Sequence, residues 1–285
     1  MPERLSTIVG RRRLCAAIRR AREDRDLTQQ EVATEMEWSL SKLIRVESGA
    51  VGVSTTDLRA LLALYTVTEP TVINDLMELA RAGRRRPWWR EYRAQMSTST
   101  LGTLIDLEVV ASRLQIFNPS ILPGLFQTEQ YARAVLGNML PPPTPVELEA
   151  RVSIRMRRQQ EVLGRGSPPS ILAVLDEAVL RRSTGDAATM GEQLDHLLSI
   201  AALPTVTIAI LPFSAGVFQL AGPFFILSFP DDPDMVYVES SLSEHLLEGT
   251  DLIQDYRNAF SLIRDKSLCP EESADLIKRS ADEFR

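Results

Sequence analysis

Apolar residues in the first third of the chain recur at the three- and four-residue spacing of amphipathic helices, in five short segments. The segments end at residues typical of helix boundaries, such as a serine or threonine before the first turn, a proline in it, or a glycine after the last. We expect five helices, at residues 13–24, 28–36, 40–48, 54–65 and 70–83, the last burying Val72, Leu76 and Leu79. Five helices of this length make a compact all-α domain.

The second and third segments are separated by only a few residues and carry clear capping patterns. Thr28 precedes a helix with Glu31 three residues later, which is a capping box, and Ser54 with Asp57 repeats the pattern further on. Ser39 is placed to cap the next helix, and Gly49 to end it in the left-handed conformation. Two short helices joined by a tight turn predict a helix-turn-helix, whose second helix presents its polar first turns to the major groove of DNA.

The pattern changes after residue 100, where short runs rich in β-branched and aromatic residues alternate with helical segments. We expect strands at residues 114–121, 170–175, 206–211, 224–229 and 235–238. Helices are expected at 104–112, after the capping residue Thr128, and at 145–163, 191–202, 251–264 and 271–284. Strands interrupted by a helix and then grouped together predict an α+β domain with a mostly antiparallel sheet and helices on one side.

The boundary between the two patterns is a basic and aromatic segment. Arg84, Arg85 and Arg86 are followed by Pro87, which breaks a helix, and then by Trp88, Trp89 and Tyr92. The arginines are compatible with phosphate contacts or with a solvated helix end, and the aromatic residues with packing on the second domain or across a dimer. We therefore divide this multi-domain chain into a DNA-binding domain at 1–84, a linker at 85–100 and an α+β domain at 101–285.

Charge is distributed unevenly along the chain, although its net value is -6. Residues 1–95 contain 17 Lys and Arg against 13 Asp and Glu, a net of +4, whereas residues 96–285 contain 15 against 25, a net of -10. The basic part contains the expected helix-turn-helix, which suits attraction to phosphate. There Arg12 and Arg13, at the start of the first helix, are candidates for phosphate contacts.

Other classes of protein receive little support. No apolar run reaches the ~20 residues of a membrane span, and the first thirty residues are charged rather than signal-like, so we expect a cytoplasmic protein without a membrane partner. Two cysteines and two histidines are too few for a disulfide framework or a Cys/His zinc site, and we expect neither a metal nor a cofactor.

The helix-turn-helix stretch resembles the phage-repressor or Xre-type family of transcriptional regulators. The match covers Leu27, Gln29, Glu31, Ala33, the position of the turn through Glu37 and Trp38, and then Ser39, Leu43, Val46, Glu47 and Gly49. The resemblance places four residues at positions that contact bases: Gln29, Leu40, Ser41 and Arg45. It places Lys42 at a position that contacts a DNA phosphate, and we expect Thr28 and Ser39 to contact phosphates as well. It also implies a structural ion pair between Arg22 and Glu47.

Two residues depart from the family pattern. Glu37 replaces the glycine that is common at the turn, and Ile44 puts an apolar side chain on a face that is normally polar. An apolar side chain there suits either a thymine-methyl contact or a contact between subunits.

The second domain extends the likeness. The segments IFNPSILPGLFQTEQYARAV, VLDEAVLRR and GPFFILSF resemble the large C-terminal domain of many actinobacterial Xre-type regulators. The resemblance implies a transcription factor, often encoded beside a small partner protein in a toxin-antitoxin-like or developmental gene pair. It assigns no agreed biochemical role to the C-terminal domain.

An enzymatic second domain is the weakest interpretation. Asp176 and Glu177 are adjacent acids at a strand end, but neighbouring strand residues point to opposite faces, and a helix start accounts for both. Neither histidine has a nucleophile or acid at a motif spacing. Three phenylalanines, Phe213, Phe218 and Phe224, suit a ligand pocket or plain core.

We therefore expect a sequence-specific regulator that binds double-stranded DNA as a homodimer on palindromic half-sites. Its second domain would mediate dimerisation and respond to a partner protein or a small molecule. The alternative is an antitoxin-like interaction module that binds a small partner protein and uses DNA binding mainly for autoregulation.

Overall fold

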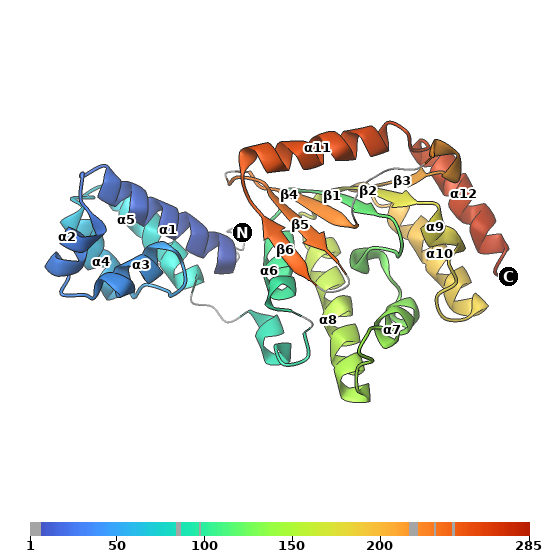
Figure 1. Ribbon diagram of the computed structural model, residues 1–285, viewed down its shortest axis with the longest axis horizontal. Coiled ribbons are helices and arrows are strands. Elements are labelled where there is room, and N and C mark those ends of the chain that lie inside the picture. Colours follow the sequence, from blue (N-terminus) through green and yellow to red (C-terminus); the bar gives the residue numbers. More distant parts are fainter. Residues whose placement is uncertain (1–6, 84–86, 97, 217–221, 231, 241–242) are drawn as a thin grey trace. The chain divides into compact units, whose positions relative to one another are not determined.

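The computed structural model describes residues 7–83, 87–96, 98–216, 222–230, 232–240 and 243–285. The chain divides into two compact units, Met1–Arg90 and Glu91–Arg285 (Figure 1). A 3-10 helix, Trp88–Tyr92, spans the point of division. The fold-class prediction of a helical helix-turn-helix domain followed by an α+β domain is confirmed.

The first unit contains the five expected helices. They are α1 (Thr7–Glu23), α2 (Gln29–Glu35), α3 (Leu40–Glu47), α4 (Thr55–Leu64) and α5 (Pro70–Ala82). Ile18, Val32, Leu43 and Leu58 have no exposed surface and form the centre of the core. One core prediction was wrong: Val72 is 43% exposed, because α5 turns Met77 and Ala80 inward together with the expected Leu76.

Local capping follows the sequence closely. Thr28 and Glu31 form the complete capping box, and the Ser39 hydroxyl accepts a hydrogen bond from the amide of Lys42. Gly49 follows α3 with a φ of 75°, as expected. The Ser54 hydroxyl caps α4 by accepting a hydrogen bond from the Asp57 amide, but the second expected capping box was wrong. The Asp57 carboxylate lies 3.4 Å from the Lys42 ammonium nitrogen instead of completing the box.

The second unit is built on a six-stranded sheet with the order β3-β2-β1-β4-β5-β6. Its strands are β1 (Arg113–Asn118), β2 (Ser170–Asp176), β3 (Val206–Leu211), β4 (Phe224–Ser228), β5 (Met235–Glu239) and β6 (Glu244–Leu247). The pairings β1–β4, β4–β5 and β5–β6 are antiparallel, whereas β1–β2 and β2–β3 are parallel. The sheet is mixed because long helical crossovers join β1 to β2 and β2 to β3, and a crossover of this kind returns the chain in the same direction. Strand β6 was not among the strands predicted from the sequence.

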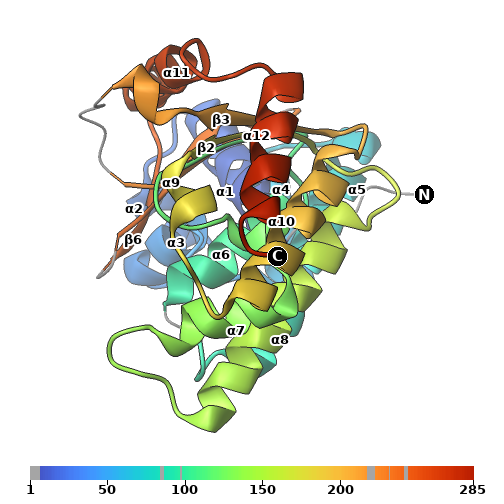
Figure 2. The ribbon, with the colours of Figure 1, turned by 90° about the vertical axis from the view of Figure 1, so that its right-hand side faces the viewer.

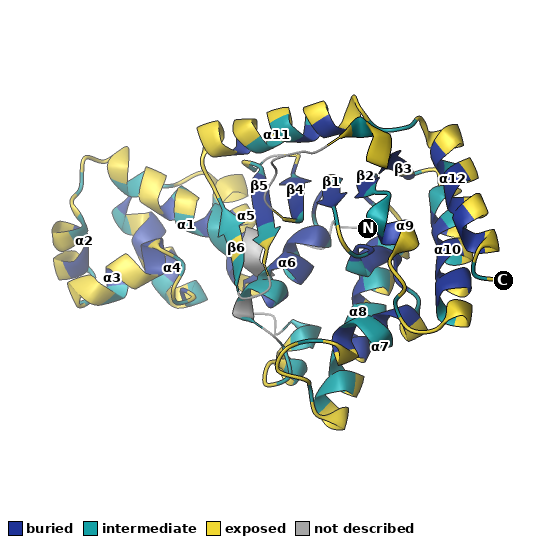
Figure 3. Ribbon diagram, turned by 45° about the vertical axis from the view of Figure 1, so that its right-hand side comes forward, coloured by how far each residue is buried: buried dark blue, intermediate teal, exposed yellow. Residues whose placement is uncertain are grey.

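Helices cover both faces of this sheet, so the expectation of helices on one side was wrong. They are α6 (Ser99–Glu108), α7 (Glu129–Gly137), α8 (Pro145–Leu163), α9 (Ala178–Arg181), α10 (Ala187–Ala201), α11 (Thr250–Arg264) and α12 (Pro270–Asp282). Figure 1 and Figure 2 show α11 over one face, with α6, α7 and α8 on the other side. The side of α11 toward the sheet is buried and its outer side is exposed (Figure 3). No helix in the described ranges is both long and apolar enough to cross a membrane.

The core beneath α11 shows which of the two expected roles, pocket lining or core, Phe224 has. Phe224 is fully buried and packs against the rings of Phe117, Tyr256 and Phe260, at centroid distances of 5.7, 5.1 and 6.3 Å. It is therefore core and not a pocket lining. Phe213 is 58% exposed, and Phe218 lies outside the described residues.

A buried ion pair joins α6 to α8 on the other side of the sheet. Arg158 Nε and Nη2 donate to the two carboxylate oxygens of Glu108, each at 2.6 Å, and the side chains are 8% and 0% exposed. One turn earlier on α8, Arg155 donates to Gln127 Oε1 at 2.6 Å. Desolvation and the neighbouring Arg158 charge lower the pKa of Arg155 to about 10.

Replacing Glu108 by glutamine leaves the Arg158 guanidinium buried without its counter-charge. We expect the free energy of unfolding of the second unit to fall by about 3 kcal/mol. The remaining charge stays buried without the attraction that offset its desolvation. Hydrogen exchange of the amides in β1 and α8 measures the change.

The matched control is Glu149→Gln, since Glu149 pairs with Arg133 at the surface and is 63% exposed. The control should exchange like the unmodified protein. Equal behaviour of the two variants would show that the buried pair does not stabilise this unit.

Candidate nucleic-acid interface

Helices α2 and α3 are held at a fixed angle by a small apolar contact and a short turn. Ala33 on α2 is fully buried and lets α3 approach closely, while Leu43 and Val46 fill the inner side of α3. The turn closes with a hydrogen bond of 2.8 Å from the Trp38 amide to the Ala33 carbonyl. Glu37 adopts a φ of 53° there, so the turn forms without the glycine common in similar sequences.

The outer side of α3 is exposed. Leu40 and Ile44 are 37% and 42% exposed, and Ser41, Arg45 and Ser48 are exposed as well. On a helix with 3.6 residues per turn, these five positions share one face, opposite the buried Leu43, Val46 and Glu47. The predicted base-contacting residues Leu40, Ser41 and Arg45 therefore lie together on one solvent-facing surface.

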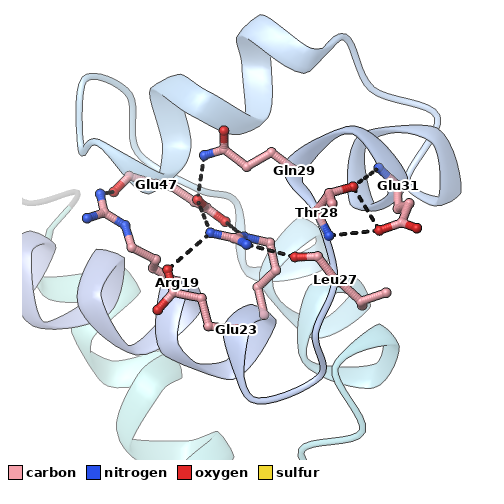
Figure 4. A network of polar contacts seen from close by, with 8 residues as sticks. Arg19, Glu23, Leu27, Thr28, Gln29, Glu31 and Glu47 are labelled. Atoms are coloured by element: carbon pink, nitrogen blue, oxygen red, sulfur yellow. Dashed lines mark hydrogen bonds and ion pairs between the residues drawn. The ribbon is translucent and has the colours of Figure 1, made fainter.

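The Glu47 carboxylate connects this helix to α1 and α2 (Figure 4). It is 1% exposed, accepts a hydrogen bond from Arg22 Nε at 2.8 Å, and accepts another from Gln29 Nε2 at 2.7 Å. Arg22 also donates to the Leu27 carbonyl at 2.7 Å, at the start of the chain segment leading into α2. The hydrogen bond to Glu47 is the largest cause of the raised pKa of Arg22. Arg22 and Glu47, expected to pair, thus fix three helices at one point.

Gln29, the fourth predicted base-contacting residue, is oriented by the same carboxylate. Its amide nitrogen faces Glu47, and its amide oxygen points away from that carboxylate (Figure 4). The sequence gives no signal for this contact, because Gln29 and Glu47 are 18 positions apart and on different helices.

The phosphate candidates Thr28, Ser39 and Lys42 occupy the helix starts. Thr28 and Ser39 are exposed, and each hydroxyl is used as a helix cap. The Lys42 ammonium lies 3.6 Å from the centroid of the Trp38 ring and 3.4 Å from Asp57 Oδ2, so its position is restrained by two neighbours that sequence reading did not identify.

One arginine of the run on α1, Arg11, makes contacts that stabilise the fold. Arg11 donates to the carbonyls of Gly49 at 3.5 Å and Gly83 at 3.2 Å, which joins the ends of α3 and α5. The candidates Arg12 and Arg13 follow it, half-buried and engaged in interactions within the protein. Arg84, Arg85 and Arg86 lie outside the described residues, and Trp88, Trp89 and Tyr92 are half-buried.

The adjacent acids of the second unit are engaged as structural acceptors. Asp176 Oδ1 accepts from the Ala178 amide at 2.8 Å, and Glu177 Oε2 accepts from the Phe213 amide at 3.0 Å. Both contacts hold the start of α9 against its neighbours. In the described part of the chain, no group of three or more His, Cys, Asp or Glu residues is placed to hold a metal ion.

Two family models match the chain. A model described as a helix-turn-helix domain matches residues 13–76, and one described as a domain of unknown function (DUF5753) matches residues 101–279, more than half of the chain. No curated protein and no solved structure matches. The first match covers α2 and α3, and the second covers nearly all of the sheet-containing unit.

Glu47→Gln tests the connection between the three helices. The Arg22 side chain is only 12% exposed and would lose its buried counter-charge, so we expect a loss of about 3 kcal/mol in the stability of the first unit. This corresponds to an increase of more than a hundredfold in the hydrogen-exchange rate of core amides in α2 and α3.

Glu23→Gln is the control for that variant. Glu23 lies 3.4 Å from the same arginine but is 59% exposed, and its replacement should leave exchange in α2 and α3 nearly unchanged. If Glu47→Gln has as little effect as this control, the buried carboxylate does not hold the helices together.

Proposed function

Because the chain belongs to the family defined by the DUF5753 domain and carries a helix-turn-helix domain at residues 13–76, we propose that it is a sequence-specific transcriptional regulator that binds operator DNA as a homodimer. The outer surface of α3 would enter the major groove, with Ser41 and Arg45 as polar base-reading residues and Gln29 beside them. Thr28, Ser39, Lys42, Arg12 and Arg13 would meet the phosphate backbone. The observation that supports this proposal most directly is the exposed face of α3 on a rigidly held helix.

The division of charge supports the same assignment. A net of +4 over residues 1–95 favours attraction to phosphate, while a net of -10 over residues 96–285 keeps the second unit away from DNA. The second unit is then free to hold two copies together. One recognition helix reads only part of a helical turn, so useful affinity requires two half-sites about 34 Å apart.

We also propose that the second unit binds another molecule. Its acidic charge favours a basic partner protein, which also supports the antitoxin-like alternative. We propose no catalytic activity, since Asp176 and Glu177 act as local acceptors at a helix start.

A gel shift on the DNA upstream of the protein's own gene, with and without the product of the adjacent gene, separates the partner-dependent role from simple operator binding.

Arg45→Ala should weaken binding to an operator selected from randomised duplexes by about 1–3 kcal/mol, roughly 5- to 150-fold, and relax the base preference at one position. Fluorescence anisotropy with competitor DNA at fixed salt measures both effects. Arg81→Ala, on an exposed position of α5, is the control and should bind within twofold of the unmodified protein. Equal affinities for both variants would contradict the assignment of α3 as the recognition helix.

Sedimentation equilibrium of the full chain should give a dimer, and selected operators should contain two inverted half-sites with centres 10 to 10.5 base pairs apart or a multiple of that spacing. A monomer that binds one copy of a non-repeated site would contradict the dimeric part of the proposal.

A further inference from the structure

The exposed face of α3 has an apolar half and a polar half. Leu40 and Ile44 are four positions apart and therefore neighbours on the helix surface, and both are more than one-third exposed. Ser41 and Arg45 form the other half of the same face. The apolar pair begins at the first residue of α3, which is the end of a recognition helix that reaches base edges.

The exposure of this pair is fixed by the inner side of the helix. Leu43, Val46 and Glu47 are 0–2% exposed, and Glu47 is bonded to Arg22 and Gln29. Rotating α3 to cover Leu40 and Ile44 would expose Leu43 and break the Glu47 contacts. The two alkyl side chains therefore stay at the surface in the absence of a bound partner.

The major groove offers one apolar group to such a surface. Among the four bases, thymine alone presents a methyl group there, at the position where cytosine has only a C5–H. Leucine and isoleucine side chains make no hydrogen bonds, so they can discriminate among bases only by covering that methyl group. Positions four apart on a helix have Cβ atoms about 5–6 Å apart, which spans one to two base steps of about 3.4 Å.

We propose that Leu40 and Ile44 form a thymine-reading pair that contacts the methyl groups of two neighbouring thymines in each half-site. Arg45 lies beside the pair and contacts an adjoining guanine. This inference rests on the proposed function, because it specifies what the recognition helix reads.

Deoxyuridine provides the direct test, since it lacks only the methyl group of thymine and keeps every hydrogen-bonding group. In a selected operator, replacing either contacted thymine by deoxyuridine should weaken binding of the full-length protein about fourfold, as expected for one buried methyl. The same replacement outside the half-sites should have no effect.

The variant Ile44→Ala connects the effect to the side chain. It should bind the thymine operator more weakly and lose most of its sensitivity to deoxyuridine at one position, and Leu40→Ala should do so at the neighbouring position. Val72→Ala is the matched control, because Val72 is a β-branched residue on α5 that is 43% exposed. It should keep both the affinity and the sensitivity of the unmodified protein.

The outcomes separate this inference from the proposed function. If Arg45→Ala weakens binding but deoxyuridine has no effect, the thymine assignment is overturned and the regulator proposal stands. If Ile44→Ala changes the sedimentation of the free protein and deoxyuridine still has no effect, the pair is a subunit contact and the inference fails. If no duplex competes better than random DNA, the proposed function itself fails.

Discussion

The arrangement of the helices in the first unit depends on the hydrogen bonds that the buried Glu47 carboxylate accepts. A buried negative charge is costly unless it is paired and hydrogen-bonded, and here it receives donors from Arg22 on α1 and Gln29 on α2 while belonging to α3. These two contacts join three helices in one arrangement, and without Glu47 the Arg22 charge would keep only the exposed Glu23 as an acidic neighbour. The orientation of the α3 surface is a consequence of this arrangement.

Much of this unit could be predicted from the sequence because its determinants are local. The capping box at Thr28, the Ser39 cap and the glycine at position 49 act within a few residues of the helices they limit. The contacts of Gln29 with Glu47 and of Lys42 with Asp57 could not be predicted, because they join residues 18 and 15 positions apart. Helical spacing indicates which face is buried, but it does not identify which polar residue lies opposite another.

The second unit shows where local patterns are insufficient. Most strands were found from their composition. Short apolar runs do not indicate strand direction, so the two parallel pairings, β1–β2 and β2–β3, could not be identified within the expected mostly antiparallel sheet. Strand β6 was missed because Glu244–Leu247 is only four residues long and its apolar and polar residues do not alternate. The ion pair between Glu108 and Arg158 spans 50 positions and was beyond sequence reading, although both residues belong to segments correctly predicted as helical.

Contact between the outer face of α3 and DNA can be measured by methyl NMR of the full 31.8 kDa chain. With Ile and Leu methyl groups labelled, addition of a selected operator should shift the signals of Leu40 and Ile44 and produce contacts between them and DNA protons. The signals of the buried Ile18 and Leu58 should change little. If the operator binds while the Leu40 and Ile44 methyl signals stay in place, the DNA lies on another surface and α3 is not the recognition helix.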